Sequence, residues 1–393
     1  MIRRIVDAAC DATQDKLMMV FLDWAKAFDR IKPDIMLQAL TRFGLPLKVV
    51  NMIRGIYDSR QLFIADHTGN SCIHAQEAGI AQGCPLSPFL FIIVQTVMFH
   101  DIYKTIHLEE EPAFVVTRDL LYADDTALLS GSQTNLQKLL HAVVVEGAKY
   151  GLELNWEKTF QMNVNTDESI YRPGGSALQQ KDELIYLGGM ISSDSCVSRE
   201  LNRRLGEGRS LFNILKRFWS HANLTMQRKL RVFNACITSK VMYALDSAWF
   251  LKVDRTRLDA FQCACLRRIL KIPPSYISRI TNAEVLRRSS QTKFSCLLES
   301  RQKHLYQKIQ MMPASALMRK LVCDVEGGPI NWNNARKPGR PCQRWGPSVF
   351  KLIQACPIDR YWSRPPFLNV GSRIIRCDEL QVPFFQPSTE TWW

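Results

Sequence analysis

The residues best able to do chemistry are acids that adjoin apolar runs. Asp23 follows the apolar run of residues 17–22, a pattern that predicts a buried strand with a carboxylate at its end. Asp124 and Asp125 lie between two apolar arms, which predicts a hairpin with carboxylates at its tip. Each site alone is more typical of surface acids at a turn. Two such sites in apolar settings, separated by a long predicted helix, favour a shared function.

Grouped carboxylates of this kind predict a metal-dependent reaction on phosphates. Carboxylates at adjoining strand ends repel one another unless a cation neutralises them. Hard oxygen ligands select Mg²⁺ or Mn²⁺. Two such ions about 3.5–4 Å apart can hold the attacking and leaving oxygens of an in-line phosphoryl displacement.

The remainder of the front half supplies elements that could position these acids. In chain order we expect a helix over residues 24–43 broken near Pro33, a hairpin over 60–75, a turn-rich loop over 81–88 that opens an apolar helix to about residue 106, a helix over 134–150 and a short hairpin over 184–191.

The rear half differs from the front half in charge and in pattern. Residues 1–190 carry a net charge of −6 and residues 191–393 carry +20, within a chain of 393 residues and net charge +14. Apolar stripes predict three basic helices, over residues 201–219, from Thr225 to about Phe250, and over 258–269. An acidic front with a basic rear suggests a catalytic part joined to a part that binds a polyanion.

Composition argues against several other classes of protein. No apolar run approaches the roughly 20 residues of a membrane span, and the charged N-terminus is unlike a secretory signal. The twelve cysteines include no C-x-x-C pair, which argues against a zinc finger or a disulfide framework. We therefore expect an intracellular protein, nuclear and cytoplasmic, with reduced thiols.

Five motifs in order resemble those of reverse transcriptases, in the form used by LINE-type (non-LTR) retrotransposons. FLDWAKAFD at residues 21–29 is similar to motif A, GIAQGCPLSPFLF at 79–91 to motif B, YADD at 122–125 to motif C, GLELNWEKT at 151–159 to motif D, and YLG at 186–188 to the primer-grip hairpin. The tetrapeptide alone is a weak signal, but the ordered set is specific. The basic helices that follow are similar to the family's thumb, so the resemblance covers about residues 1–272.

The resemblance implies roles for residues at the matching positions. Asp23 and Asp124 would be metal ligands, and Asp125 a supporting acid. Lys158 would be a general acid for the departing pyrophosphate or a fixed charge near it. Phe28 resembles the steric gate that excludes a ribose 2′-hydroxyl, although its spacing is as consistent with core packing.

Other matching positions would contact the nucleotide, the primer and the duplex. Gln82 and Gly83 resemble the loop that touches the incoming nucleotide and template. The primer grip would comprise Tyr186, Leu187 and Gly188, with Tyr186 equally suited to the core. The thumb residues expected to bind nucleic acid are Arg203, Arg204, Lys216, Arg217, Arg228 and Lys229.

The resemblance thus implies an α+β fold. Residues 1–191 would form a reverse transcriptase palm, an antiparallel sheet backed by helices, with partial fingers. Residues 192–272 would form an all-α basic thumb, and residues 273–393 a basic C-terminal extension of uncertain role. The implied activity is an RNA-directed DNA polymerase that adds deoxynucleotides to a primer 3′-OH on an RNA template, with two Mg²⁺ or Mn²⁺ ions.

Two alternatives stay open at the level of sequence. Only residues 1–16 and 37–78 are available for fingers, so the chain resembles an N-terminally truncated copy whose activity we expect to be impaired. It would then be a non-catalytic nucleic-acid-binding remnant of a retroelement. A group II intron maturase-type reverse transcriptase is the other alternative, disfavoured by the run CPLSP in motif B. Phe28 disfavours an RNA-dependent RNA polymerase.

Overall fold

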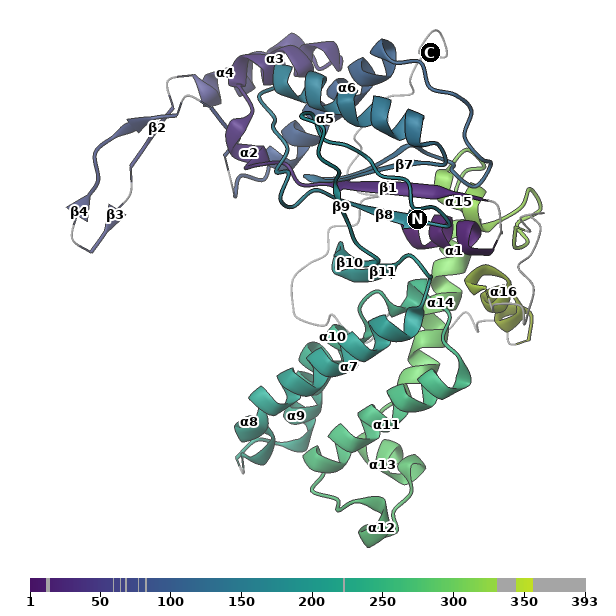
Figure 1. The fold of residues 1–393 in the computed structure, drawn as a ribbon. Coiled ribbons are helices and arrows are strands. Elements are labelled where there is room, and N and C mark those ends of the chain that lie inside the picture. The colour runs from purple at the N-terminus through teal and green to yellow at the C-terminus, as the bar shows by residue number, and fades with distance from the viewer. Residues whose placement is uncertain are drawn as a thin grey trace.

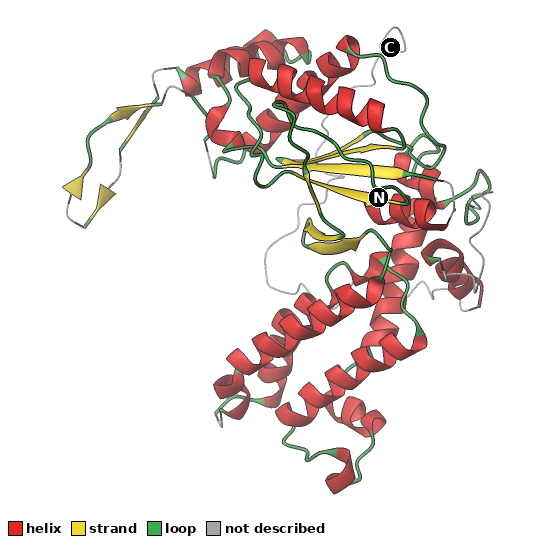
Figure 2. Ribbon diagram, in the orientation of Figure 1, coloured by secondary structure: helices red, strands yellow, loops and turns green. Residues whose placement is uncertain are grey.

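A computed structural model describes residues 1–11, 15–58, 60–63, 65–67, 69–76, 78–81, 83–221, 223–330 and 344–355. Gln82 of the predicted nucleotide site lies outside the described residues, as do 331–343 and 356–393 of the predicted C-terminal extension. Figure 1 shows a sheet with helices on both faces, and below it a helical region joined to the sheet by a small hairpin. Figure 2 separates the strands of the upper part from the all-helical lower part.

The central sheet has five strands in the order β6-β7-β1-β8-β9. Their bounds are β1 Leu17–Leu22, β6 Asp119–Tyr122, β7 Asp125–Ser130, β8 Phe160–Val164 and β9 Gln179–Gln180. All pairs are antiparallel except β8 with β9, which is parallel. This arrangement confirms the predicted α+β class, with one short parallel strand at the edge of an otherwise antiparallel sheet.

The middle strand explains why the sheet is covered on both faces. All six residues of β1 are buried, and successive side chains of a strand point to opposite faces. Met18, Val20 and Leu22 belong to one hydrophobic core, whereas Leu17, Met19 and Phe21 belong to another. A continuous apolar strand is therefore required, which accounts for the uninterrupted run that precedes Asp23.

Helices from the front half of the chain pack over the first core. They are α2 Ala27–Arg30, α3 Pro33–Arg42, α4 Leu47–Tyr57, α5 Ser87–Thr105 and α6 Gln133–Lys149. The break between α2 and α3 falls at Pro33, the first residue of α3, as the sequence predicted. α5 is apolar on most sides because it is buried between α3 and α6.

The opposite face joins the two ends of the described chain. The helices there are α1 Ile2–Asp11, α14 Phe294–Gln310, α15 Leu317–Val322 and α16 Trp345–Ala355. Tyr306 and Trp345 lie fully buried beside α1 in this second core. Figure 1 shows these four helices together at one end of the sheet.

The predicted finger hairpin projects away from the sheet (Figure 1). It consists of β2 Gln61–Leu62 paired with β5 His74–Ala75, and of β3 Ala65–Asp66 paired with β4 Gly69–Asn70. The predicted hairpin over residues 60–75 is thereby confirmed.

A separate hairpin links the sheet to the helical region. Its strands are β10 Glu183–Tyr186 and β11 Gly189–Ser192. The helices that follow are α7 Val197–Ile214, α8 Lys216–Ser220, α9 Met226–Val232, a π-helix Phe233–Thr238, α10 Ser239–Met242, a 3₁₀ turn Leu245–Ser247, α11 Lys252–Ile269, α12 Ser275–Ser278 and α13 Asn282–Ser289. They enclose a third core, and we call residues 197–289 the thumb.

The helical region departs from the sequence prediction at the end of its second helix and beyond residue 272, where α12 and α13 were not predicted. The helix that Thr225 caps ends at Met242 and does not run to Phe250, because Ala244 is left-handed (φ 61°) and Leu245 to Phe250 fold into the core. The helix α14 was not predicted. Phe294 and Leu298 lie in the thumb core while Tyr306 and Ile309 lie in the core below the sheet, so the thumb core continues past residue 272.

None of the described helices is both long and apolar enough to cross a membrane.

Candidate active site

Strand register brings the three predicted acids to one edge of the sheet. Tyr122 pairs with Asp125, so Ala123 and Asp124 form a two-residue loop at the tip of the β6–β7 hairpin. Leu22 pairs with Thr126, which places Asp23, the next residue, beside Asp125. Asp23 is half-buried and the other two acids are exposed. The predicted hairpin tip and strand end are confirmed, and they adjoin.

The electrostatics of this edge favour a cation. Burial, and then the neighbouring charges of Asp124 and Asp23, raise the pKa of the Asp125 carboxyl above its ordinary value. Within the described ranges, no three His, Cys, Asp or Glu side chains are grouped closely enough to hold a metal ion. The carboxylate donors nevertheless fit a hard divalent ion, because a cation would relieve the repulsion they now carry.

A buried hydrogen-bond network lies next to the acids, around Thr126. The Thr126 hydroxyl accepts hydrogen bonds from Nε1 of Trp24 at 3.2 Å and from Nε2 of Gln95 at 3.1 Å. All three residues are buried. Trp24 belongs to motif A, Thr126 directly follows motif C, and Gln95 lies on α5 beyond motif B, so one hydroxyl joins three segments distant in sequence. None of its members has a diagnostic spacing, so this network could not be predicted from the sequence.

Lys158 lies at the same edge as the acids. Its Nζ is 4.0 Å from Oδ2 of Asp23, and the two side chains are 69% and 43% exposed. The loop that carries Lys158 is tied to motif A, because the Asn155 amide donates to the Asp23 carbonyl oxygen at 2.7 Å. The exposure of both side chains keeps this ion pair weak.

Phe28 packs in part against the core, which is one of the two roles that its spacing allowed. Its ring stacks on the buried Phe91 ring with centroids 4.6 Å apart, and it is half-buried beside the first core. The Ile80 amide donates to the Phe28 carbonyl oxygen at 2.6 Å, which ties motif B to motif A. Phe91 thus supports the ring of Phe28 from one side.

The predicted nucleotide loop contributes Gln82 and Gly83, and of these two Gly83 is among the described residues. Gly83 has φ +82°, and a Cβ built on it would meet no atom within 4 Å. The left-handed backbone favours glycine, and no atom of the described residues crowds the position. The backbone at Gly83 is open to a ligand.

The predicted primer grip forms the turn between β10 and β11. Leu187 and Gly188 are the two loop residues, both left-handed (φ 49° and 75°), and Tyr186 pairs with Gly189. The Tyr186 ring meets the edge of the Phe21 ring with centroids 5.2 Å apart. Its hydroxyl is buried without a hydrogen-bond partner among the described residues, and burial, followed by the charge of Asp125, raises its pKa. Tyr186 therefore packs under the site.

The six basic thumb residues divide into two groups. Lys216, Arg217 and Arg228 are exposed, and in the described part of the chain they form no ion pair. The other three are committed inside the protein, which differs from the expectation that they meet phosphates.

Two of these three are buried. Arg204 is 3% exposed and paired with Glu200, while Lys229 is 4% exposed and donates to the Trp219 carbonyl oxygen. Arg203 is bound by Glu200 and Glu207. An acid one helical turn away pairs with a basic side chain and holds it inside the protein, as Glu200 does with Arg203 and Arg204.

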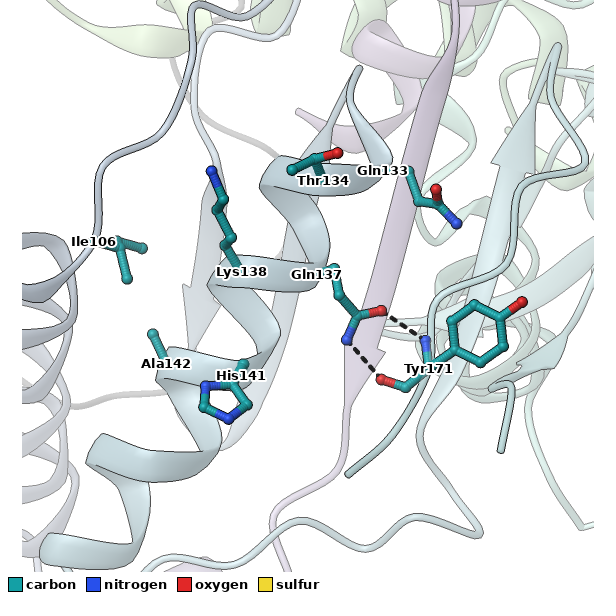
Figure 3. A pocket seen from close by; sticks show the side chains of 8 residues that line it. All are labelled: Ile106, Gln133, Thr134, Gln137, Lys138, His141, Ala142 and Tyr171. Atoms are coloured by element: carbon teal, nitrogen blue, oxygen red, sulfur yellow. Dashed lines mark hydrogen bonds between the residues drawn. The ribbon is translucent and has the colours of Figure 1, made fainter. Parts of the chain in front are cut away.

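A cavity of about 610 Å³ lies along α6, apart from the predicted site residues (Figure 3). Figure 3 shows Gln137 bonded to the backbone of Tyr171, which it contacts through both its amide nitrogen and its oxygen. Each bond is 2.8 Å long. The cavity wall is thus tied to the loop after β8, and no acid lines it.

The geometry agrees with the family to which the front half of the chain is similar. Residues 2–191 match the protein family described as reverse transcriptase (RNA-dependent DNA polymerase). These residues form a reverse transcriptase domain, and they include all three acids, Lys158 and the primer-grip turn. Proteins of this family generally use divalent metal ions.

Individual relatives narrow the assignment. The chain is 25% identical to the RNA-directed DNA polymerase from mobile element jockey of Drosophila funebris, over 69% of this chain and 30% of that protein. It is 31% identical to a Pol polyprotein from the type-1 retrotransposable element R2 of Nasonia vitripennis, over 47% of this chain and 19% of that protein. The reverse transcriptase domain is therefore of the non-LTR retrotransposon type that its motifs indicated. The chain spans less than a third of the length of these relatives.

Among solved structures, apo telomerase from Candida tropicalis aligns with 81% of this chain and 56% of its own chain, at 16% sequence identity and a TM-score of 0.39.

Proposed function

We propose that this chain is an RNA-directed DNA polymerase that extends a DNA primer on an RNA template with deoxynucleoside triphosphates. The observation that carries the proposal is the convergence of Asp23, Asp124 and Asp125 at adjoining strand ends, in a domain of the reverse transcriptase family. Strand register brings together acids that are 101 positions apart in the chain.

The acids would hold two Mg²⁺ or Mn²⁺ ions, with Asp23 and Asp124 as ligands and Asp125 as a supporting acid. When bound, such ions stabilise the charge on the attacking and leaving oxygens. Bound cations would also relieve the like-charge repulsion at Asp125, whose pKa is raised by burial and by the other two carboxylates.

The remaining residues would orient the substrates and neutralise charge. Lys158, whose Nζ is 4.0 Å from Oδ2 of Asp23, would donate a proton to the departing pyrophosphate or stabilise its charge by a fixed positive charge. Phe28, supported by Phe91, would present its ring to the sugar of the incoming nucleotide and disfavour a 2′-hydroxyl. Gln82 and the open backbone at Gly83 would contact the nucleotide and the template. Little covalent chemistry is asked of the protein, so positioning accounts for most of the rate.

The duplex would lie between the sheet and the thumb. Lys216, Arg217 and Arg228 are the predicted thumb residues whose exposure leaves them free to neutralise phosphates. The turn at Leu187 and Gly188 would hold the primer end near the acids.

Primer extension tests the proposal. Purified protein receives a 5′-labelled DNA primer on an RNA template, the four deoxynucleoside triphosphates and Mg²⁺ or Mn²⁺, beside an Asp23→Asn variant. We expect extension by the wild-type protein and none by the variant. Extension that survives in Asp23→Asn would remove the acids from the mechanism, and an inactive wild-type protein that still binds the duplex would favour the binding remnant.

A further inference from the structure

The turn at the tip of the β10–β11 hairpin has both of its carbonyl groups bonded to thumb side chains. The Tyr243 hydroxyl donates to the Leu187 carbonyl oxygen at 3.0 Å. Nη2 of Arg203 donates to the Gly188 carbonyl oxygen at 2.8 Å, and Nη2 of Arg204 donates to the same oxygen. A two-residue turn ordinarily leaves such groups to water, so three donors on one turn indicate a built contact.

Two of these side chains, Arg204 and Tyr243, also pack on each other. The Arg204 guanidinium lies over the Tyr243 ring, 4.8 Å from its centroid. A Cβ built on Gly188 would lie 3.2 Å from Cε1 of Tyr243, so the ring presses against the turn. The Tyr243 side chain is thus held between an arginine of α7 and the hairpin tip.

A buried acid fixes the two arginines. Glu200 is 1% exposed, and it accepts hydrogen bonds from Nε of Arg204 at 2.7 Å and from Nε of Arg203 at 2.8 Å. Its second oxygen also accepts from the Met190 amide of β11 at 3.2 Å. Because the carboxylate is fully bonded, the guanidinium groups have defined positions. Helix α7 is therefore hydrogen-bonded to both strand β11 and the turn.

We propose that Tyr243, Arg203 and Arg204 are positioning residues, which fix the Leu187–Gly188 turn against the thumb so that the primer 3′ end is held in line with the acids. This inference rests on the proposed function, because it takes the turn to be the primer grip. Tyr186, which precedes the turn, packs against Phe21, two residues before Asp23. A turn displaced from the thumb would thus be displaced from the catalytic edge as well.

The experiment compares Tyr243→Phe with Tyr276→Phe. The first variant loses only the bond to Leu187 and keeps the ring over which Arg204 lies. The control removes a hydroxyl from an 81% exposed tyrosine on α12. Arg203→Lys added to Tyr243→Phe also removes the planar donor that reaches Gly188 while keeping the positive charge. Single-turnover extension rate, primer–template Kd and thermal midpoint are measured for each protein.

We expect Tyr243→Phe to slow single-turnover extension about threefold to tenfold, and the double variant to slow it further, because a lost hydrogen bond misplaces the primer end. We expect the primer–template Kd to stay within about twofold of the wild-type value, well short of a tenfold change. Tyr276→Phe should match the wild-type protein. A weaker Kd with an unchanged rate would mean that these side chains bind nucleic acid directly, which overturns the proposal. A lower thermal midpoint with an unchanged rate would show a purely structural role and would overturn it too.

Amide hydrogen exchange separates this inference from the proposed function. In the protein without nucleic acid, we expect faster exchange over residues 187–190 in the double variant than in the wild-type protein. A wild-type protein that extends no primer would contradict the proposed function. Unchanged exchange over these residues would contradict the inference that Tyr243 and Arg203 fix the turn.

Discussion

Two turns of the same length lie on the two hairpins of the site, and they are held in opposite ways. Ala123-Asp124 and Leu187-Gly188 are both two-residue loops whose first residue is left-handed, with φ of 54° and 49°. In the described part of the chain, the Asp124 side chain has no hydrogen-bond or ion-pair partner, whereas both carbonyl groups of the second turn are bonded to the thumb. A turn whose acceptors stay free suits a ligand such as a cation, and a turn whose acceptors are occupied suits a fixed support.

The largest effect should come from removing charge at the first turn. We expect Asp124→Asn to lower the single-turnover extension rate by at least about 10³-fold, because loss of a metal ligand removes several kcal/mol of transition-state stabilisation and 1.36 kcal/mol is a factor of ten. Asp125→Asn should lower it less, by about 10- to 100-fold, if Asp125 only supports the ligands. Equal losses in both variants would make Asp125 a full ligand.

Asp125→Asn should also change stability in a direction set by its pKa. The pKa of Asp125 is raised in the folded protein, so the folded state binds the proton more tightly and loses stability as the pH rises through that pKa. Neutralising the residue should therefore raise the thermal midpoint at pH 7 and leave it nearly unchanged at a pH below the unfolded pKa of about 3.9. Thermal unfolding at several pH values measures this, and a lower midpoint at pH 7 would contradict the repulsion among the three acids.

The buried support beneath the first turn should have the next largest effect. Thr126→Val removes the hydroxyl that accepts from Trp24 and Gln95, which leaves two buried donors unpaired. We expect the free energy of unfolding to fall by about 2–6 kcal/mol, at about 1–3 kcal/mol for each donor, and the extension rate to fall with it. Denaturant unfolding and single-turnover extension measure the two effects. Thr96→Val is the matched control, since Thr96 is exposed and its hydroxyl donates to the Ile92 carbonyl oxygen of the same helix. An equal loss in the control would discount the network.

The thumb surface should affect binding and leave the turns intact. Replacing Lys216, Arg217 and Arg228 together with Gln should weaken duplex binding at every sequence and reduce the slope of log K against log salt by about 2–3, because each phosphate contact contributes about 0.7–0.9. If about five thumb charges meet phosphates, the wild-type slope lies near −3.5 to −4.5. Lys229→Met should instead lower stability without changing that slope, because Lys229 is buried against Trp219. Fluorescence anisotropy at several salt concentrations distinguishes the two outcomes.

The smallest effect should come from relieving the left-handed residue of the first turn. Ala123→Gly should raise the free energy of unfolding by about 0.5 kcal/mol, because the left-handed strain of an L-residue, about 1–2 kcal/mol, exceeds the entropy cost of glycine, about 0.5–1 kcal/mol. Ala260→Gly, at an exposed site in the middle of α11, should lower it by about 1 kcal/mol. Urea unfolding of both variants gives the comparison, and two losses would show that the turn carries no strain.

The strand before Asp23 and the hairpin around Asp124 follow from short-range patterns, so the sequence predicted them, whereas strands β8 and β9 were not predicted. A buried run that ends in Asp23 and a hairpin around Asp124 each depend on a few adjacent residues, and the alternation of β1 between two cores follows from its continuous burial. The same reasoning applies to the turn at Gly188.

What the sequence did not predict depends on contacts between distant segments. The Thr126 hydroxyl joins three segments, and nothing local marks it. Arg204 and Lys229 look like surface charges on a helix. Both are buried, because Arg204 pairs with Glu200 and Lys229 donates a hydrogen bond to the Trp219 carbonyl oxygen. Helix α14 contributes to two cores, with Phe294 and Leu298 in one and Tyr306 in the other. Its apolar residues therefore form no strong single stripe in the sequence.

The most direct test of the central claim is a metal titration of primer extension. Single-turnover extension of oligo(dT) on poly(rA) is measured against the Mg²⁺ or Mn²⁺ concentration for the wild-type protein and for Asp23→Asn. If the acids hold the catalytic ions, the wild-type rate should rise from zero with metal and saturate, and Asp23→Asn should show no rise over the same range. Extension that proceeds without divalent metal, or that responds to metal equally in both proteins, would contradict the account.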